Sequence, residues 1–167
     1  PVAPTEYANV TVAAAAATTE PGQFVPVEPC RLIDTRDGDA LGAGGSVDVM
    51  VAGACSIPVE AVAAAVTVTA VRPAAMGFVT IWPGDEAQPE TSVVNYRPGQ
   101  VVANSQLVRL GPDGAVHAFS LAATDLIVDV TGYLRAAPSP VAAGRFVSVS
   151  PTRLLDSRFA IGHNGPP

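Results

Sequence analysis

The chain has 167 residues and a mass of 16.9 kDa, which is the size of one ordinary domain. Hydrophobic residues make up 49% of it and charged residues 14%, a balance that excludes a disordered acidic chain. The formal net charge of −6 disfavours nucleic acid as a partner, and no apolar run approaches the roughly 20 residues that insert across a membrane.

Residues 1–22 are small, rich in Ala and Thr and bracketed by proline, so we interpret them as an N-terminal extension or linker. Short β-type runs separated by turns follow from Phe24 onward. Their expected ranges are 24–27, 31–34, 46–51, 63–71, 77–82, 91–96, 101–110, 115–121 and 126–134. Eight or nine short strands at a spacing of about 10 residues predict an all-β domain, a sandwich or jelly-roll-like fold, over residues 23–135.

Two local features qualify this pattern. Gly111-Pro112-Asp113-Gly114 predicts a hairpin turn, because Pro fixes φ and Gly tolerates a positive φ. Residues 60–65 (EAVAAA) favour a helical turn by propensity, whereas the Val/Thr run that follows them favours a strand.

The chain then repeats part of itself. A Pro/Ala linker covers residues 136–145, and residues 146–167 form a partial second repeat. Within it, residues 146–158 (FVSVSPTRLLDSR) match residues 24–36 (FVPVEPCRLIDTR) at eight of 13 positions. The second copy has Thr152 where the first has Cys30.

Cys30 and Cys55 are the only cysteines. They are interpreted either as two buried thiols or as one disulfide that closes a loop of about 25 residues. The turn-like sequence beside both favours the disulfide, which implies an exported protein.

The residues that open and close the 24–134 segment resemble a known repeat. FVPVEPCRLIDTR, then AGACSIP, and finally VDVTGY resemble, in order, a repeat common in secreted and surface proteins of actinobacteria and related bacteria. The resemblance implies a non-catalytic, β-rich module found in tandem or attached to secreted enzymes. It implies no defined ligand.

The strongest polar pattern is an Arg–Asp–Arg motif that occurs in both copies. Its residues are Arg31, Asp34 and Arg36, then Arg153, Asp156 and Arg158. In a regular strand, Arg31 and Asp34 face opposite sides, while Asp34 and Arg36 share one. We interpret the motif as a structural staple in which Asp34 is held by Arg36 and backbone amides, with an anion-binding clamp as the alternative.

Catalytic and metal-binding patterns are weak. Asp34, Asp37 and Asp39 offer oxygens to Ca²⁺, but their spacing is not that of an EF-hand, and a solvated acidic turn is favoured. His117 and His163 lie in no zinc-ligand spacing, and no G-x-S-x-G motif is present. The sequence also lacks lysine, which excludes Schiff-base and Ser–Lys chemistry. We therefore predict no enzyme activity, no metal and no cofactor.

Aromatic residues raise one binding hypothesis. Trp82 and Tyr96 are candidate glycan contacts, because sugars stack on exposed aromatic rings, but packing in the core is the simpler interpretation. A carbohydrate-binding module attached to a secreted or cell-surface protein, with a cell-wall or surface glycan as its partner, is the alternative function.

The favoured function is an exported, extracellular or cell-surface structural module that forms an array or filament. Its expected assembly strand is the C-terminal copy, docked head-to-tail on a neighbouring molecule by strand addition or exchange, rather than on its own domain. The apolar contacts expected from it are Phe146, Val147, Val149, Leu154 and Leu155.

Overall fold

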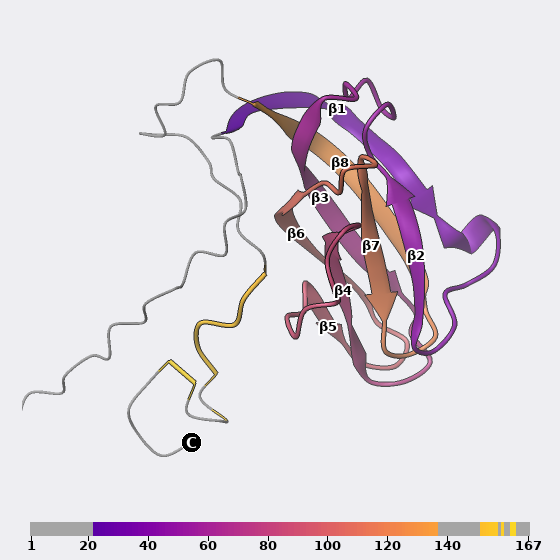
Figure 1. The fold of residues 1–167 in the computed structure, drawn as a ribbon. Helices are drawn as coiled ribbons and strands as arrows, with labels where there is room; N and C mark the ends of the chain where they lie inside the picture. Colours follow the sequence, from indigo (N-terminus) through magenta and orange to yellow (C-terminus); the bar gives the residue numbers. More distant parts are fainter. Residues whose placement is uncertain (1–21, 137–150, 157, 159–160, 163–167) are drawn as a thin grey trace, which may run out of the picture.

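The computed structural model describes residues 22–136, 151–156, 158 and 161–162. Residues 22–136 form two four-stranded antiparallel sheets packed face to face, as a β-sandwich (Figure 1). The predicted all-β fold is confirmed, and the sheets do not close into a barrel.

The first sheet has the order β1-β8-β3-β6, so β1 and β6 are its edges. Its strands are β1 (Gly22–Asp34), β8 (Asp125–Ala136), β3 (Ala61–Val71) and β6 (Val101–Arg109).

The second sheet has the order β2-β7-β4-β5. Its strands are β2 (Gly45–Met50), β7 (Ala115–Ser120), β4 (Gly77–Pro83) and β5 (Val94–Tyr96). Most strand ends lie within two residues of the sequence prediction, because turn residues bracket each run. β5 is the exception, since it begins three residues later than expected.

β1 differs from the prediction of two separate segments. It is one strand of 13 residues, paired along its length with β8. Its register shifts between Pro26 and Cys30 and again between Arg31 and Ile33. The bulges let the strand continue past Pro29, which donates no backbone hydrogen bond.

Residues 61–65 belong to β3, so the helical turn suggested by their propensity is wrong. β3 lies between β6 and β8. Its inward residues are buried, among them Val66 and Val68, which are 1% and 0% exposed. Hydrogen bonding to two neighbouring strands and this burial override the helix propensity of alanine.

The core between the sheets is made mainly of valine, whose branched side chain packs well on a pleated surface. Its fully buried members include Val49, Val66, Val79, Val116 and Val128. The predicted turn at residues 111–114 is present, with Gly114 at φ 79° and its amide donating to the Gly111 carbonyl oxygen at 2.9 Å. In the described part of the chain, no helix is long and apolar enough to cross a bilayer.

Candidate functional site

The first Arg–Asp–Arg motif lies where β1 ends. Asp34 caps the 3₁₀ turn Thr35–Asp37 by accepting a hydrogen bond from the Arg36 amide at 3.2 Å. The Arg36 side chain donates two hydrogen bonds to the same carboxylate, from Nε to Oδ1 at 2.8 Å and from Nη2 to Oδ2 at 2.6 Å. The ion pair that the sequence predicted between Asp34 and Arg36 is therefore present.

Arg31 also reaches Asp34, contrary to the expectation that the two face opposite sides. Its Nη1 donates to Asp34 Oδ2 at 2.8 Å. The register shift between Arg31 and Ile33 interrupts the two-residue alternation of the strand, so the simple face count does not apply there.

Asp129 completes this cluster and was missed by the sequence reasoning. Arg31 Nε donates to Asp129 Oδ1 at 2.9 Å and Nη2 to Oδ2 at 3.4 Å, so β1 is tied to β8 by a two-pronged contact. Asp129 belongs to the VDVTGY segment, which was singled out by resemblance alone. Only the pairing of Arg31 opposite Asp129 reveals its role.

These contacts determine the protonation of the cluster. The hydrogen bond from the Arg36 guanidinium, helped by the Arg36 amide and by the charges of both arginines, holds the pKa of Asp34 well below its usual range. The carboxylate is thus ionised at neutral pH. An anion clamp would need free guanidinium donors, but both arginines of this motif already face carboxylates.

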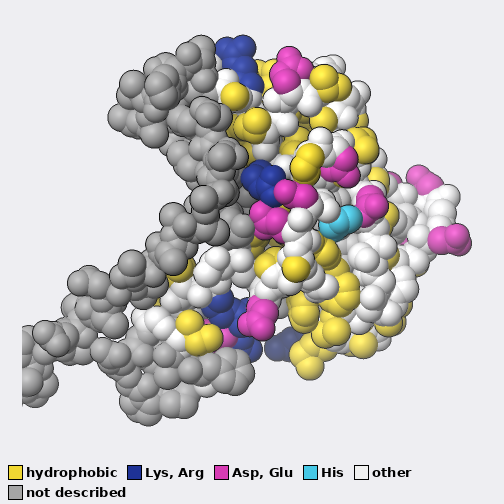
Figure 2. Space-filling model, viewed as in Figure 1, with side chains coloured by type: hydrophobic (Ala, Val, Ile, Leu, Met, Phe, Trp, Pro, Cys, Tyr) yellow, Lys and Arg dark blue, Asp and Glu magenta, His cyan; other side chains and the backbone are white. Residues whose placement is uncertain are grey.

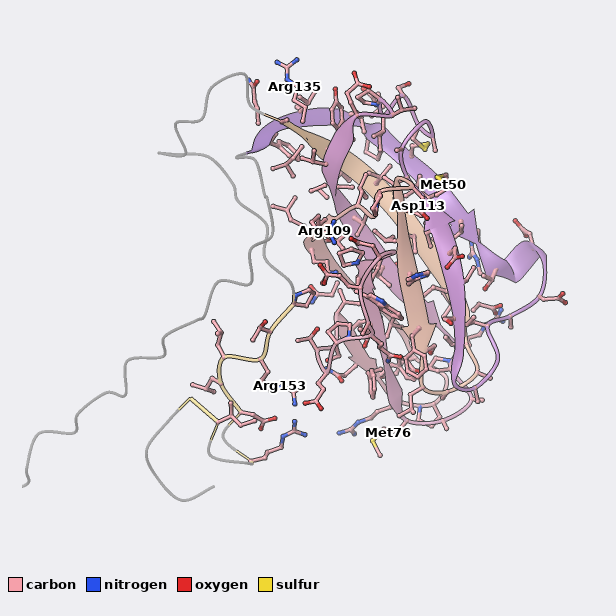
Figure 3. The ribbon with its side chains drawn as sticks, in the orientation of Figure 1. Met50, Met76, Arg109, Asp113, Arg135 and Arg153 are labelled. Atoms are coloured by element: carbon pink, nitrogen blue, oxygen red, sulfur yellow. A yellow bond between two sulfur atoms is a disulfide. The ribbon has the colours of Figure 1, made fainter. Side chains whose placement is uncertain are left out.

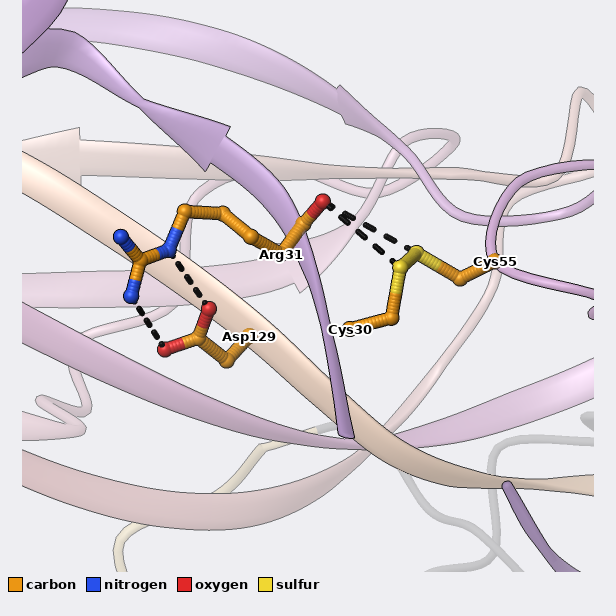
Figure 4. Close-up of a disulfide and its surroundings, with 4 residues drawn as sticks. All are labelled: Cys30, Arg31, Cys55 and Asp129. Carbon is orange, nitrogen blue, oxygen red and sulfur yellow. Dashed lines mark hydrogen bonds and ion pairs between the residues drawn. A yellow bond between two sulfur atoms is a disulfide. The ribbon is translucent and has the colours of Figure 1, made fainter. Parts of the chain in front are cut away.

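The disulfide lies beside this cluster (Figure 4). Cys30 of β1 is bonded to Cys55 in the loop between β2 and β3, so the predicted pairing is confirmed. The bond joins β1, an edge strand of the first sheet, to the loop that follows β2 of the second sheet. A disulfide is typical of proteins outside the reducing cytoplasm.

A shallow hollow of about 490 Å³ opens over the same region. Its lining residues are Pro29, Cys30, Arg31, Thr67, Asp129 and Thr131. Thr67 already shares a hydrogen bond of 2.8 Å with the Ser105 hydroxyl, and Arg31 holds Asp129. These polar side chains of the hollow are thus already bonded within the fold.

The second Arg–Asp–Arg motif repeats the geometry of the first. The Arg158 amide and Nε donate to Asp156 Oδ1 at 3.1 and 2.9 Å, and Arg158 Nη2 to Oδ2 at 2.7 Å. Arg153 Nη1 donates to Asp156 Oδ2 at 3.1 Å. The hydrogen bond from Arg158 lowers the pKa of Asp156 to about 2.

The surroundings of the two motifs differ. In the first motif, Arg31 bonds to the Asp129 carboxylate. The corresponding Arg153 instead donates through Nη2 to the Glu90 carbonyl oxygen at 2.7 Å, in the loop between β4 and β5. Asp34 pairs with Ile127 of β8, whereas Asp156 pairs with Ile161, only five residues away. Within the described residues, the second motif thus keeps its internal bonds without pairing to a strand of the sandwich.

The predicted assembly strand is only partly described. Phe146, Val147 and Val149 lie outside the described residues. Leu154 and Leu155 are 57% and 64% exposed and belong to no strand, so in a single chain they do not make the expected apolar contacts.

The candidate glycan contacts are wrong. Trp82 and Tyr96 are only 6% and 3% exposed. The Trp82 indole donates to the Glu86 carbonyl oxygen at 3.0 Å, and the Tyr96 hydroxyl lies 2.6 Å from that of Ser120. The polar group of each ring is hydrogen-bonded inside the fold and the rings are buried, so the pair offers no stacking surface.

His117 is also held by neighbouring strands. Its Nδ1 contacts Asp48 of β2 and its Nε2 lies 3.0 Å from the Gly84 carbonyl oxygen, while its ring packs 5.4 Å from that of Trp82. Among the residues that the structure describes, no three His, Cys, Asp or Glu side chains are grouped to hold a metal ion. Asp37 and Asp39 flank the exposed turn after β1, while Asp34 is engaged by arginine.

Comparison of the sequence with protein-family models and with curated proteins finds no match. The function is therefore proposed from the two Arg–Asp–Arg motifs and the strands near them.

Proposed function

We propose that the chain is an exported, non-enzymatic structural module of a bacterial surface array or filament, and that copies associate head-to-tail through the C-terminal copy of the motif. One observation carries the proposal: two segments 122 residues apart share an Arg–Asp–Arg motif with the same internal hydrogen bonds. One of them ends an edge strand of the sandwich, and the other lies in the C-terminal segment.

The properties of this segment support docking on a larger surface. Residues 146–167 are too few to bury a core of their own. Leu154, Leu155 and Ile161 are nonetheless 40–64% exposed. Covering such apolar side chains with a partner stabilises the complex.

Charge also supports association between copies. Residues 145–162 hold three arginines and one acid, so their formal charge is +2, while the whole chain is −6. Acidic side chains are spread over the face of the sandwich in Figure 2. A basic segment on an acidic module favours contact between one copy and the next. The carbohydrate-binding alternative loses the aromatic pair on which it rested.

The test is to delete residues 145–167 and to measure mass by light scattering and shape by electron microscopy across a concentration series. The full chain is expected to form elongated oligomers and the truncated chain to stay monomeric. A matched control carries residues 146–167 in scrambled order, which keeps length and charge. Equal assembly by the full, truncated and scrambled chains would contradict the proposal.

A further inference from the structure

β6 differs from the other three edge strands of the sandwich. β1 contains Pro26 and Pro29, two bulges and a disulfide, all of which hinder the addition of a strand. β5 has only three residues. β2 has six, and its Asp48 is held by His117 across to β7. β6 has nine residues, and from Val101 to Val108 it contains neither proline nor charge.

The outer edge of β6 presents backbone groups. The Leu110 amide donates to the Val62 carbonyl oxygen, and the Arg72 amide to that of Gln100. These two bonds show the alternation of the antiparallel ladder. The backbone N–H and C=O groups of even-numbered β6 residues bond to β3, and those of odd-numbered residues point away from β3.

Among the outward amides, that of Ser105 is satisfied by its neighbour Asn104, whose Oδ1 accepts it at 2.9 Å. The amides of Val101, Ala103 and Leu107 have no partner among the described residues. The side chains of Val101 and Leu107 are 68% and 42% exposed, so this edge is also apolar.

The second Arg–Asp–Arg motif contacts the loop between β4 and β5, and this loop is bonded to β6. Arg153 bonds to Glu90, and three residues further along the same loop the Val93 carbonyl oxygen accepts from Asn104 of β6 at 2.8 Å. Arg109, at the end of β6, holds Asp85 and Glu86 of that loop. Figure 3 shows Arg153 and Arg109 on the same side of the sandwich. The acidic loop thus brings a basic tail to the vicinity of β6.

We infer that the outer edge of β6 accepts the C-terminal copy of a second chain as an added strand of the first sheet. This inference rests on the proposed function and names its acceptor. In the first copy, the same sequence pattern forms β1, an edge strand of that same sheet. In one chain, residues 151–155 pair with no strand, so they do not occupy their own β6. Because donor and acceptor surfaces differ, the contact does not close on itself and extends into a fibre.

Hydrogen exchange tests the acceptor directly in the full chain. The outward amides of Val101, Ala103 and Leu107 are expected to become protected as protein concentration rises, and to lose that protection when residues 145–167 are deleted. Protection that is independent of concentration would mean docking within one chain and would overturn the inference. Unchanged exchange of these amides in an assembling full chain would overturn β6 as acceptor while leaving the proposed function standing. A full chain that does not assemble would overturn both.

Edge variants provide a second readout. Ala103→Pro removes an outward amide without removing a bond to β3, and is expected to weaken association about tenfold, the effect of losing one or two backbone hydrogen bonds. Ala103→Lys, which places a charge on the edge, serves if the proline variant does not fold. The matched control is Ser46→Lys on β2, an exposed edge position of the other sheet. Equal association by folded Ala103 variants and the parent, or equal loss in the control, would overturn the inference.

Discussion

At the scale of single residues, Asp34 joins three kinds of contact at one carboxylate. It caps the 3₁₀ turn, pairs with Arg36 and pairs with Arg31, which in turn holds Asp129 of β8. Its side chain is only 11% exposed, so the carboxylate depends on these donors in place of water. The end of β1 is thereby tied both to the following turn and to the neighbouring strand.

Replacing this carboxylate tests its contribution. Asp34→Asn is expected to lower the melting temperature, because the neutral amide no longer satisfies two guanidinium groups. Asp39→Asn, in the exposed loop after the turn, is the matched control and is expected to leave the melting temperature unchanged. Calorimetry of both variants checks this, and equal melting temperatures for Asp34→Asn and the parent would show that the motif does not stabilise the fold.

The same carboxylate predicts a pH dependence. The pKa of Asp34 is lower in the folded chain than the value of about 3.9 typical of an unfolded one, so its stabilisation is complete above pH about 4. It is lost as pH falls through the folded pKa. The free energy of unfolding should therefore fall more steeply below pH 4 in the parent than in Asp34→Asn. Denaturant titrations at several pH values measure the two slopes, and parallel slopes would refute this assignment.

At the scale of elements, the docking of β1 on β8 depends on one glycine. Phe24 lies directly over Gly132, so that a Cβ there would overlap the ring and lie 2.9 Å from the Val25 carbonyl oxygen. The close approach is possible only because position 132 has no side chain. The ring of Phe24 thus covers the backbone of β8 at the start of the β1–β8 pair.

Gly132→Ala is expected to destabilise the fold by about 1–3 kcal/mol, the usual effect of overpacking. Gly42→Ala is the control, since a Cβ at Gly42 meets nothing within 4 Å. Chemical denaturation of the two variants gives the difference. A Gly132→Ala variant as stable as Gly42→Ala would mean that β1 shifts on β8 without loss.

The disulfide provides the second constraint on β1. Removing it in the Cys30→Ser, Cys55→Ser double variant is expected to lower the free energy of unfolding by roughly 3 kcal/mol, the chain-entropy value for a loop of this length. Urea titrations of the parent with and without reductant should show the same loss. A midpoint that does not change with reduction would mean that the β1–β8 contacts alone hold the strand.

At the scale of the whole molecule, charge separates the C-terminal segment from the sandwich. The formal charge of residues 145–162 is +2 within a chain of −6. The observed contact of this segment lies at a loop that carries Asp85, Glu86 and Glu90. This contact lies within one chain, and the same attraction between the basic segment and the acidic loop supports the proposed head-to-tail contact between copies.

Association should accordingly weaken with salt. Raising ionic strength from about 0.05 M to about 0.5 M shortens the screening length severalfold and is expected to reduce the oligomer fraction measured by analytical ultracentrifugation. The chain without residues 145–167 serves as control and should not respond. Oligomers that grow with salt would indicate an apolar contact in place of the charged one.

Most strands and the Arg–Asp–Arg motif can be predicted from the sequence alone, and the sequence also favours the disulfide. Alternating valines and bracketing Gly and Pro are local signals, so the ranges of β2, β3, β4, β6, β7 and β8 follow from residues near in the chain. The bonds among Asp34, Arg36 and the Arg36 amide likewise span only two residues. Such features need no knowledge of the rest of the fold.

Contacts between residues far apart in the sequence could be found only from the tertiary structure. The carboxylate of Asp129 meets Arg31 across 98 positions, because β8 lies beside β1 in one particular register. A bulge placed Arg31 and Asp34 together where simple alternation had separated them. Trp82 and Tyr96 are buried by packing between strands, and the Glu86 carbonyl oxygen and the Ser120 hydroxyl satisfy their polar groups there. Register, bulges and burial are set by packing between strands, a property that no short stretch of sequence contains.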